Sequence, residues 1–310
     1  MRCLVTGGAG FIGSNLVDAL VARGDEVTIV DDLSSGRREN LEQALAAGAR
    51  LAEADVRDGE ALLDLARQAR PEAVFHLAAQ IDVRKSVEDP AFDASINVGG
   101  TALVLEAARA VGSPRVVFIS TGGAIYGEGE GQDLPLDESA PIAPMSAYGQ
   151  SKFAAEGYLS LYERLYGQPG VSLRLGNVYG PRQDPLGEAG VIAIFCGRLE
   201  AGGRPTVYGD GTQTRDYIYV GDVVAAALAA AESHASGAIN IGTGIETDVL
   251  ELAARLGELA GRDDFAPELA PPRTGEVQRI ALDPGRAERE LGWRAETGLE
   301  EGLRLTLNAI

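Results

Sequence analysis

Residue types that build metal centres and disulfide frameworks are scarce in this sequence. Among 310 residues there are two cysteines, Cys3 and Cys196, and two histidines, His76 and His234. Their spacing fits neither a disulfide framework nor a zinc site. No apolar run reaches the length of a membrane-spanning helix, and Met1 leads into a short β-like run without a signal-peptide pattern. We therefore expect a cytoplasmic protein that binds no metal and spans no membrane.

Basic residues are also in short supply. The chain carries 46 acidic against 27 basic residues, a net charge of −19 and a pI near 4.5. This balance argues against nucleic-acid and anionic-membrane partners. The preference for Arg over Lys fits GC-rich coding, the acidic surface fits a high-salt cytoplasm, and the composition agrees with both. An apolar fraction of 45% is ordinary for a globular protein of one α/β unit or two lobes.

Lysine occurs at only two positions, Lys85 and Lys152. Lys152 follows Tyr148 by four residues, at the start of a stretch, 153–166, whose apolar residues have helical spacing. One helical turn would place the ammonium and the phenol on the same face. A nearby ammonium favours the phenolate and lowers a pKa that starts near ~10, so Tyr148 is a candidate general base. The spacing alone is a weak motif that needs support from the rest of the chain.

A glycine-rich turn follows the first expected strand, residues 2–6. Gly7 permits a tight turn, Gly10 lets the backbone approach a pyrophosphate, and Gly13 lets the following helix pack on the strand. A second strand over 26–30 completes the dinucleotide-binding order of strand, turn, helix and strand. Free N–H groups at the start of the helix would bind the phosphates.

An acid ends the second strand at the position that selects the cofactor. Asp31 would accept hydrogen bonds from the adenosine ribose hydroxyls and disfavour the 2′-phosphate of NADP. Arg37 and Arg38 come close behind, so the sequence favours NAD strongly without excluding NADP. The predicted cofactor is NAD.

β-like runs and helical patterns alternate through the first half of the chain. This alternation predicts an α/β fold with a doubly wound parallel sheet of Rossmann type, covered by helices on both faces. Ligands bind at the carboxyl ends of such strands, where Asp55, Ala79 and Thr121 fall. His76, inside a strand, is interpreted as a packed core histidine. Further strands are expected at 49–54, 73–77, 115–119 and 171–175, and helices at 60–70 and 92–111.

The alternation becomes irregular after residue 176. We expect an NAD-binding domain over 1–176, with some return of the chain around 217–245. A smaller mixed α/β lobe over 177–310 would bind the substrate. Within it we expect a strand over 206–208 and amphipathic helices over 220–232, 249–260 and 299–307.

A series of motifs covers nearly the whole chain. They are the turn from Thr6 to Gly13, Asp31 with Asp32, Asp55 with Val56, the run from His76 to Ala79, Asn97, Ser120 with Thr121, Tyr148 with Lys152, and the run from Arg215 to Tyr217. Together they resemble the extended short-chain dehydrogenase/reductase superfamily, and within it the NAD-dependent epimerase/dehydratase family. The chain is most similar to the bacterial UDP-glucose 4-epimerases of that family. The resemblance implies a tightly held NAD and a homodimer joined through the helices around 92–111 and 148–166.

The resemblance also implies a set of site residues. Acid–base catalysis falls to Tyr148, Lys152 and Thr121. Arg215 and Arg273 would clamp the pyrophosphate of a UDP-sugar, and Glu276 would hold the uridine ribose. The cofactor-binding residues implied are Gly7, Gly10, Phe11, Ile12, Gly13, Asp31, Asp32, Ser34, Ser35, Gly36, Asp55, Val56, Leu77, Ala78, Ala79, Gln80, Asn97, Ser120, Tyr148 and Lys152. The substrate-binding residues implied are Thr121, Tyr148, Asn177, Val191, Thr206, Val207, Tyr208, Arg215, Arg273 and Glu276.

Three positions depart from the family's pattern. Gly122 stands where a catalytic serine is usual, so Thr121 is expected to supply that hydroxyl. Residues 122–124 carry no acid, which disfavours the related 4,6-dehydratases. Ile81 stands in place of a lysine, which leaves Lys152 to contact the nicotinamide ribose.

These features predict a nucleotide-sugar 4-epimerase that interconverts UDP-glucose and UDP-galactose through a 4-keto intermediate. One alternative is a 4-epimerase of UDP-glucuronate, a UDP-N-acetylhexosamine or a UDP-pentose. Another is a reductase or dehydratase of dTDP- or GDP-sugars. A non-catalytic NAD-binding regulator would need a disabled Tyr148–Lys152 pair, and the pair is intact here.

Overall fold

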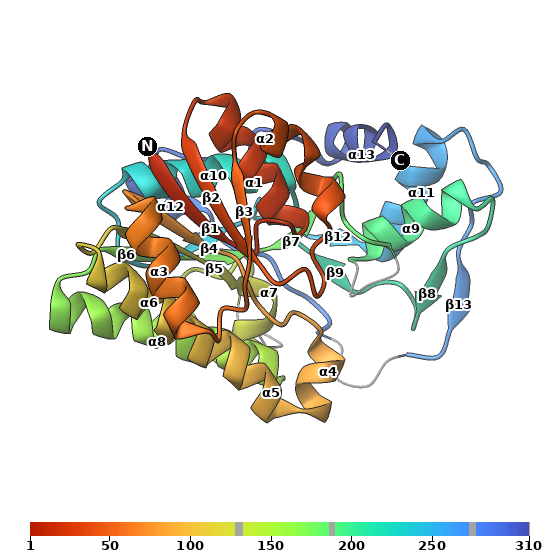
Figure 1. Ribbon diagram of the computed structural model, residues 1–310. Helices are drawn as coiled ribbons and strands as arrows, with labels where there is room; N and C mark the ends of the chain where they lie inside the picture. Colours follow the sequence, from red (N-terminus) through yellow and green to blue (C-terminus); the bar gives the residue numbers. More distant parts are fainter. Residues whose placement is uncertain (128–132, 186–189, 273–276, 310) are drawn as a thin grey trace.

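A seven-stranded parallel sheet forms the larger part of the molecule (Figure 1). The computed structural model describes residues 1–127, 133–185, 190–272 and 277–309. The predicted Rossmann-type sheet is confirmed, and a seventh strand from far along the sequence extends it. The spatial order is β11 (Gly237–Ile241), β6 (Gly170–Leu175), β5 (Arg115–Thr121), β4 (Ala73–His76), β1 (Arg2–Thr6), β2 (Glu26–Asp31) and β3 (Arg50–Glu53).

Helices cover both faces of this sheet, because its central strands are apolar on both sides. β4, for example, is buried along its whole length. One face packs against α1 (Phe11–Ala22), α2 (Glu42–Ala46), α10 (Val220–Glu232) and α12 (Gly285–Leu291). The other face packs against α3 (Gly59–Ala69), α6 (Thr101–Ala110) and α8 (Ala147–Tyr166).

The single helix expected over 92–111 is wrong in detail, because three elements take its place. They are α5 (Pro90–Ala94), a π-helical turn, η2 (Ser95–Gly100), and α6. Asn97 lies in the π turn, and its carbonyl accepts a hydrogen bond of 2.6 Å from the Thr101 hydroxyl. A π turn adds a residue to the winding without a change in composition, so the apolar pattern alone could not reveal it.

Helix α8 carries the two residues that the sequence singled out. Ser146 caps its start, where Oγ accepts from Gly149 N at 3.1 Å, and Gly167 ends it with a φ of +65°. The helix therefore already includes Tyr148, and Lys152 follows one turn later on the same face. None of the described helices is both long enough and apolar enough to cross a bilayer.

A smaller lobe lies to the right of the sheet in Figure 1. Its core is shared by α9 (Val191–Glu200), β8 (Thr206–Tyr208), α11 (Val249–Leu259) and α13 (Leu299–Leu307). The division at residue 176 stays a prediction. Short strand pairs are β8 with β13 (Glu268–Ala270), β7 (Asn177–Tyr179) with β10 (Tyr217–Tyr219), and β9 (Thr214–Arg215) with β12 (Thr247–Asp248). Short helices are η1 (Arg38–Leu41), α4 (Val83–Glu88) and α7 (Gly122–Ile125).

A buried carboxylate, Asp216, ties several later segments of the chain together. It is 1% exposed and accepts hydrogen bonds from the backbone of Thr243, Gly244 and Leu282, at 2.9, 3.0 and 3.1 Å. The Thr243 hydroxyl adds a fourth, at 2.6 Å. Four donors offset the cost of burying the charge. This anchor fixes Leu282, which bounds the candidate site described below.

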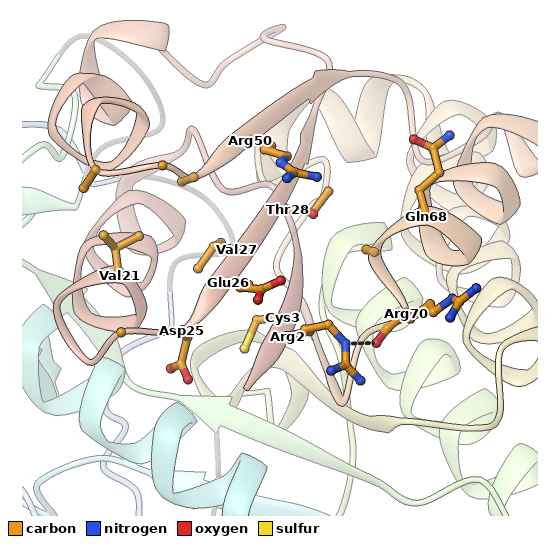
Figure 2. A pocket seen from close by; sticks show the side chains of 15 residues that line it. Arg2, Cys3, Val21, Asp25, Glu26, Val27, Thr28, Arg50, Gln68 and Arg70 are labelled. Carbon is orange, nitrogen blue, oxygen red and sulfur yellow. Dashed lines mark hydrogen bonds between the residues drawn. The ribbon is translucent and has the colours of Figure 1, made fainter.

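A hollow of about 340 Å³ opens at the amino ends of β1 and β2 (Figure 2). Arg2, Cys3, Asp25 and Arg70 are among the residues that line it, and the Met1 amino group bonds Asp25 at 2.5 Å. Ligands of parallel sheets bind at the opposite, carboxyl ends of the strands. We therefore place the site at the carboxyl edge, next to the glycine-rich turn.

Candidate active site

The glycine-rich turn between β1 and α1 leaves no room for side chains at two of its glycines. Gly7 has a φ of +70°, and a Cβ there would lie 2.5 Å from Ala78 N. A Cβ on Gly13 would lie 2.1 Å from Gly7 O, so the helix can approach the strand only without it. A Cβ on Gly10 would meet only Gly7 O, at 3.3 Å. Gly10 thus keeps an open face at the start of α1, where Phe11 and Ile12 follow and phosphate oxygens bind well.

Asp31 faces back onto this turn from the end of β2. It is 7% exposed, and its two oxygens accept from Ala9 N at 2.8 Å and from Leu33 N at 2.9 Å. Burial raises its pKa, and these two backbone donors oppose the rise. Each oxygen keeps a second lone pair for a ribose hydroxyl. The open turn and this acid fit an NAD molecule.

Arg37 and Arg38, the two arginines that could bind the 2′-phosphate of NADP, both form ion pairs with acidic side chains. Arg37 pairs with Asp184 at 2.7 Å, and Arg38 pairs with Glu53 at 2.8 Å. A 2′-phosphate would have to compete with these carboxylates as well as with Asp31. The structure therefore strengthens the preference for NAD.

The other predicted cofactor residues gather along the carboxyl edge. Asp32, Ser34, Ser35 and Gly36 follow β2, and Asp32 accepts from the Ser34 hydroxyl at 2.6 Å. Leu77, Ala78, Ala79 and Gln80 follow β4, and Gln80 N donates to Asn97 Oδ1 at 2.9 Å. Asp55 is held by Arg57 at 2.5 Å, and the Val56 side chain is 6% exposed in the core. Their roles toward a cofactor stay predictions.

Thr121 and Tyr148 meet at the end of β5. The neighbouring Thr121 side chain lowers the pKa of the Tyr148 phenol and so favours its ionised form. Burial nevertheless raises the pKa of Tyr148 to about 12, and the charge of Asp93 adds to the rise. This direction is opposite to the one expected from Lys152. The reason is that desolvation of a phenol outweighs the help from its neighbours within the chain.

Lys152 points into the protein from the second turn of α8. It is 3% exposed, and Nζ donates to Ile119 O at 2.7 Å and lies 4.5 Å from the ring centroid of Phe118. Burial lowers its pKa to about 7, against the opposing charges of Glu156 and Asp93. The ammonium is therefore poised to change its charge near neutral pH.

A buried ion pair links strand β6 to helix α8 near Lys152. Arg174 on β6 pairs with Glu156 on α8 at 2.7 Å, and Arg174 also donates to the Tyr126 hydroxyl at 2.8 Å. The Ser120 hydroxyl donates to Glu156 at 2.6 Å. The Ser120 side chain thus belongs to this network, and its predicted contact with the cofactor would have to come from its backbone.

The glycine at position 122 has a steric explanation. A Cβ there would lie 2.4 Å from Leu282 Cδ1, so Leu282 occupies the space that a serine side chain would need. At Gly123 a Cβ would lie at ordinary contact distances, 3.5 Å from Asn177 Oδ1 and 3.9 Å from Thr121 Oγ1. Thr121 and Asn177 therefore lie on the open side of this turn, beside Tyr148.

The predicted substrate residues lie on several elements of the C-terminal half. Val191 starts α9, β8 contains Thr206, Val207 and Tyr208, and Arg215 ends β9, where Nη1 donates to Thr214 O at 2.8 Å. Val207 is 1% exposed, so only its backbone can meet a ligand. Arg273 and Glu276 lie outside the described residues. Their binding roles stay predictions.

His76 is the core histidine that the sequence indicated. Its Nδ1 lies 2.7 Å from Thr6 Oγ1 and its Nε2 lies 2.9 Å from Thr101 Oγ1. Burial lowers its pKa to about 3, so it is neutral and structural. Within the described residues no group of three or more His, Cys, Asp and Glu side chains could hold a metal ion.

Two charged residues near Tyr148 and Lys152 were not predicted from the sequence. Glu156 follows Lys152 by one helical turn, and Asp93 precedes Asn97 by one turn. That spacing on a helical face was the available signal. Neither residue belongs to one of the motifs that carry the family resemblance.

Comparisons with known proteins agree with this geometry. Residues 3–242 match the NAD dependent epimerase/dehydratase family. A UDP-glucose 4-epimerase of Mycolicibacterium smegmatis is 47% identical over 309 residues, which are 99% of this chain and 97% of the relative. The Thermotoga maritima UDP-glucose 4-epimerase, solved with UDP-glucose, is 46% identical with a TM-score of 0.95, over 100% of this chain and 98% of that one. The Thermus thermophilus enzyme, solved with NAD, is 47% identical with a TM-score of 0.91 over the same shares. The chain belongs to the NAD-dependent epimerase/dehydratase family.

Proposed function

We propose that this protein is an NAD-dependent UDP-glucose 4-epimerase, which interconverts UDP-glucose and UDP-galactose. The observation that carries the proposal is that Tyr148, next to Thr121 and one helical turn before the buried Lys152, lies at the carboxyl edge of the same sheet as the glycine-rich turn and Asp31. This arrangement places an acid–base group at the edge of the sheet where the cofactor's reactive ring is expected. The relatives described above, at 46 to 47% identity, carry the same activity in their names.

The reaction needs one proton and one hydride to leave C4 of the sugar and return. The Lys152 ammonium favours the phenolate form of Tyr148. This phenolate takes the proton of the C4 hydroxyl. NAD, when bound, accepts the hydride and gives it back, and its positive ring adds to the field that favours the phenolate. Once the 4-keto sugar has turned its other face, the hydride would return to C4 with inversion, and Tyr148 gives the proton back to the C4 oxygen. Because the reaction causes no net oxidation, the cofactor need not leave the protein between cycles.

Thr121 takes the place of the hydroxyl that position 122 cannot carry. Thr121 lowers the pKa of Tyr148 and so favours the phenolate that takes the proton of the sugar hydroxyl. Because Leu282 fills the space at Gly122, a serine or an acid fits there only if the Leu282 side chain shifts. This steric limit also argues against a 4,6-dehydratase, which needs an acid in this turn.

The C-terminal lobe is expected to hold the UDP group. Arg215 and Arg273 would bind the pyrophosphate, since forked guanidinium groups match phosphate oxygens. Arg182 follows β7 and could otherwise bind the carboxylate of a uronate, but it pairs with Asp18 at 2.6 Å. That pairing favours neutral hexoses over UDP-glucuronate.

A homodimer is part of the proposal. Large apolar side chains on α8 remain exposed, at 37 to 60% of their surface, along the helix that the family uses for dimerisation. They are Phe153 at 37%, Tyr158 at 38%, Leu165 at 60% and Tyr166 at 48%. Several exposed aromatic and aliphatic groups on one helix are typical of a helix that packs on a partner. The cytoplasmic location stays a prediction.

A panel of nucleotide sugars tests the activity and the alternatives together. The purified protein is incubated without added cofactor, and the products are separated by chromatography. We expect UDP-galactose to give UDP-glucose. Conversion only of UDP-pentoses, UDP-glucuronate or UDP-N-acetylhexosamines would move the assignment to another sugar. Loss of water from a dTDP- or GDP-sugar, or inertness toward the whole panel, would refute it.

A further inference from the structure

A buried carboxylate, Asp93, lies close to the catalytic pair and has no part in the chemistry described above. It sits on α5 and is 0% exposed. Its Oδ1 accepts from Gln80 Nε2 at 2.9 Å and from Asn97 Nδ2 at 3.1 Å, whereas Oδ2 has no hydrogen-bond partner among the described residues. A carboxylate oxygen buried without a partner is costly, so this residue needs a functional explanation.

Hydrogen bonds connect Asp93 with the first turn of α8. Asn97 Nδ2, which binds Asp93, also donates to Ser151 Oγ at 3.0 Å, and Ser151 Oγ donates to Tyr148 O at 3.0 Å. Asn97 further exchanges two hydrogen bonds of 2.9 Å with the backbone of Gln80. The network therefore joins the cofactor edge of β4, the π turn and the backbone of the candidate base.

Asp93 also acts through space on both members of the pair. Burial raises the pKa of Tyr148, and the charge of Asp93 raises it further. Burial lowers the pKa of Lys152, and the charges of Glu156 and Asp93 oppose that fall. His76, on the strand below, is neutral. Asp93 is thus the buried charge that disfavours the phenolate and favours the ammonium at once.

The remaining charged groups near α5 are at the surface. Helix α4, which also packs on α5, carries Arg84, Lys85 and Glu88, all exposed. The Lys85 ammonium lies 4.7 Å from the ring centroid of Phe92. Solvent screens such groups far more than it screens a buried carboxylate. Within the described residues, Asp93 and Glu156 therefore dominate the field of acids around the pair.

We propose that Asp93 is a positioning residue of the epimerase, which holds the first turn of α8 through Asn97 and Ser151 and sets a buried negative charge beside the Tyr148–Lys152 pair. The inference rests on the proposed function. With Asp93 in place, the base forms only where the positive charge of the bound cofactor offsets both the burial of the phenol and the buried carboxylate. A chain without cofactor would then hold no phenolate, and proton removal would be coupled to cofactor occupancy.

Asp93→Asn removes this charge with little change in shape. The amide oxygen can keep both bonds that Oδ1 accepts, from Gln80 and Asn97, while the amide nitrogen takes the place of the unpartnered Oδ2. Asp89→Asn is the matched control, because Asp89 is exposed, lies on the same helix and caps it by accepting from Phe92 N at 3.0 Å. An asparagine caps a helix as well as an aspartate does.

The test titrates the phenol of Tyr148 in the holoenzyme by ultraviolet absorbance. Subtracting the same titration of Tyr148→Phe isolates this tyrosine. Removal of a nearby negative charge stabilises the phenolate, so we expect Asp93→Asn to lower the titration midpoint by about one pH unit. Asp89→Asn should leave it in place. An unchanged or higher midpoint in Asp93→Asn would overturn the proposal.

The pH profile of epimerisation gives a second readout. Loss of Asp93 lowers the pKa values of both Tyr148 and Lys152, so both limbs of kcat/KM should move toward acid. A merely structural role would reduce the rate without moving the limbs, which would contradict the proposal. The titration is independent of the sugar, so it separates failure of this inference from failure of the epimerase assignment.

A second variant guards against poor folding. Asp93→Ser also removes the charge and keeps an oxygen acceptor, and we expect the same acid shift. If Asp93→Asn and Asp93→Ser both fail to yield folded protein while Asp89→Asn folds, Asp93 serves the fold, and the proposal is refuted.

Discussion

The side chain of Thr121, at the end of β5, neighbours the phenol of Tyr148, in the first turn of α8, and lowers the pKa of that phenol. This contact brings a strand residue and a helix residue together at the carboxyl edge of the sheet. It supplies from position 121 the hydroxyl that the steric limit at Gly122 excludes. The proposed acid–base chemistry depends on Thr121 and Tyr148.

Thr121→Val tests that contact. Without the hydroxyl donor the phenolate loses stabilisation, so the pKa of Tyr148 should rise and kcat should fall by roughly 10- to 1,000-fold. The ascending limb of the pH profile should move toward alkali. Thr121→Ser keeps the hydroxyl and should stay within about threefold of the parent enzyme. Equal activity of the valine and serine variants would show that the hydroxyl has no role.

Tyr148→Phe tests the general base itself. Removing the group proposed to accept the C4 proton should lower kcat by several orders of magnitude, roughly 10²- to 10⁴-fold or more. Cofactor binding should persist, because the glycine-rich turn and Asp31 are untouched. Tyr158→Phe is the control, since Tyr158 lies on the same helix with 38% of its surface exposed. Turnover like that of the parent in Tyr148→Phe would contradict the assignment.

Lys152→Met tests the cost of burying an ammonium. Burial lowers the pKa of Lys152 from 10.5 to about 7, so the unfolded chain binds more protons between these values. Stability therefore rises with pH across this window, and the penalty is largest below it. At neutral pH the variant should be more stable by roughly 1–3 kcal/mol, although inactive. The gain should shrink toward pH 10.5.

Thermal unfolding of the lysine variants at neutral and alkaline pH measures this effect. Lys85→Met serves as the control, because Lys85 is exposed and should show no such pH-dependent gain. A Lys152→Met protein that is less stable than the parent at neutral pH would mean that the ammonium stabilises the fold.

Gly122→Ser tests the steric explanation for the missing serine. Its Cβ would lie 2.4 Å from Leu282 Cδ1, so we expect a loss of about 1–3 kcal/mol in the free energy of unfolding and no gain in activity. Leu282→Ala should relieve the clash, making the double variant less unstable than the sum of the single effects. Gly123→Ser, with ordinary contacts, should cost less than about 0.5 kcal/mol. Additive effects at 122 and 282 would exclude the clash.

The cofactor half of the site could be predicted because its signals are local. The turn from Gly7 to Gly13 and the acid at Asp31 lie within one βαβ unit, so short-range spacing carries them. The alternation of apolar runs likewise predicted the sheet, and the helical spacing after Lys152 predicted the one-turn separation from Tyr148.

The rest of the site depends on contacts between distant segments. Leu282 reaches Gly122 from a segment whose backbone is held by Asp216 and by Leu136, and no local pattern encodes this. The direction of the Tyr148 pKa was missed for the same reason, since it follows from desolvation and from Asp93 across the packed helices. Burial is a property of the whole fold and cannot be read from residue spacing.

The most direct test of the central claim follows deuterium at C4 of the sugar. UDP-galactose with deuterium at C4 is incubated with the protein, without added NAD, in ordinary water. If hydride leaves C4 for a cofactor held by the glycine-rich turn and returns while Tyr148 handles only the proton, the UDP-glucose formed keeps its deuterium at C4. Product that has exchanged this deuterium for solvent hydrogen, or an absence of product, would contradict the account.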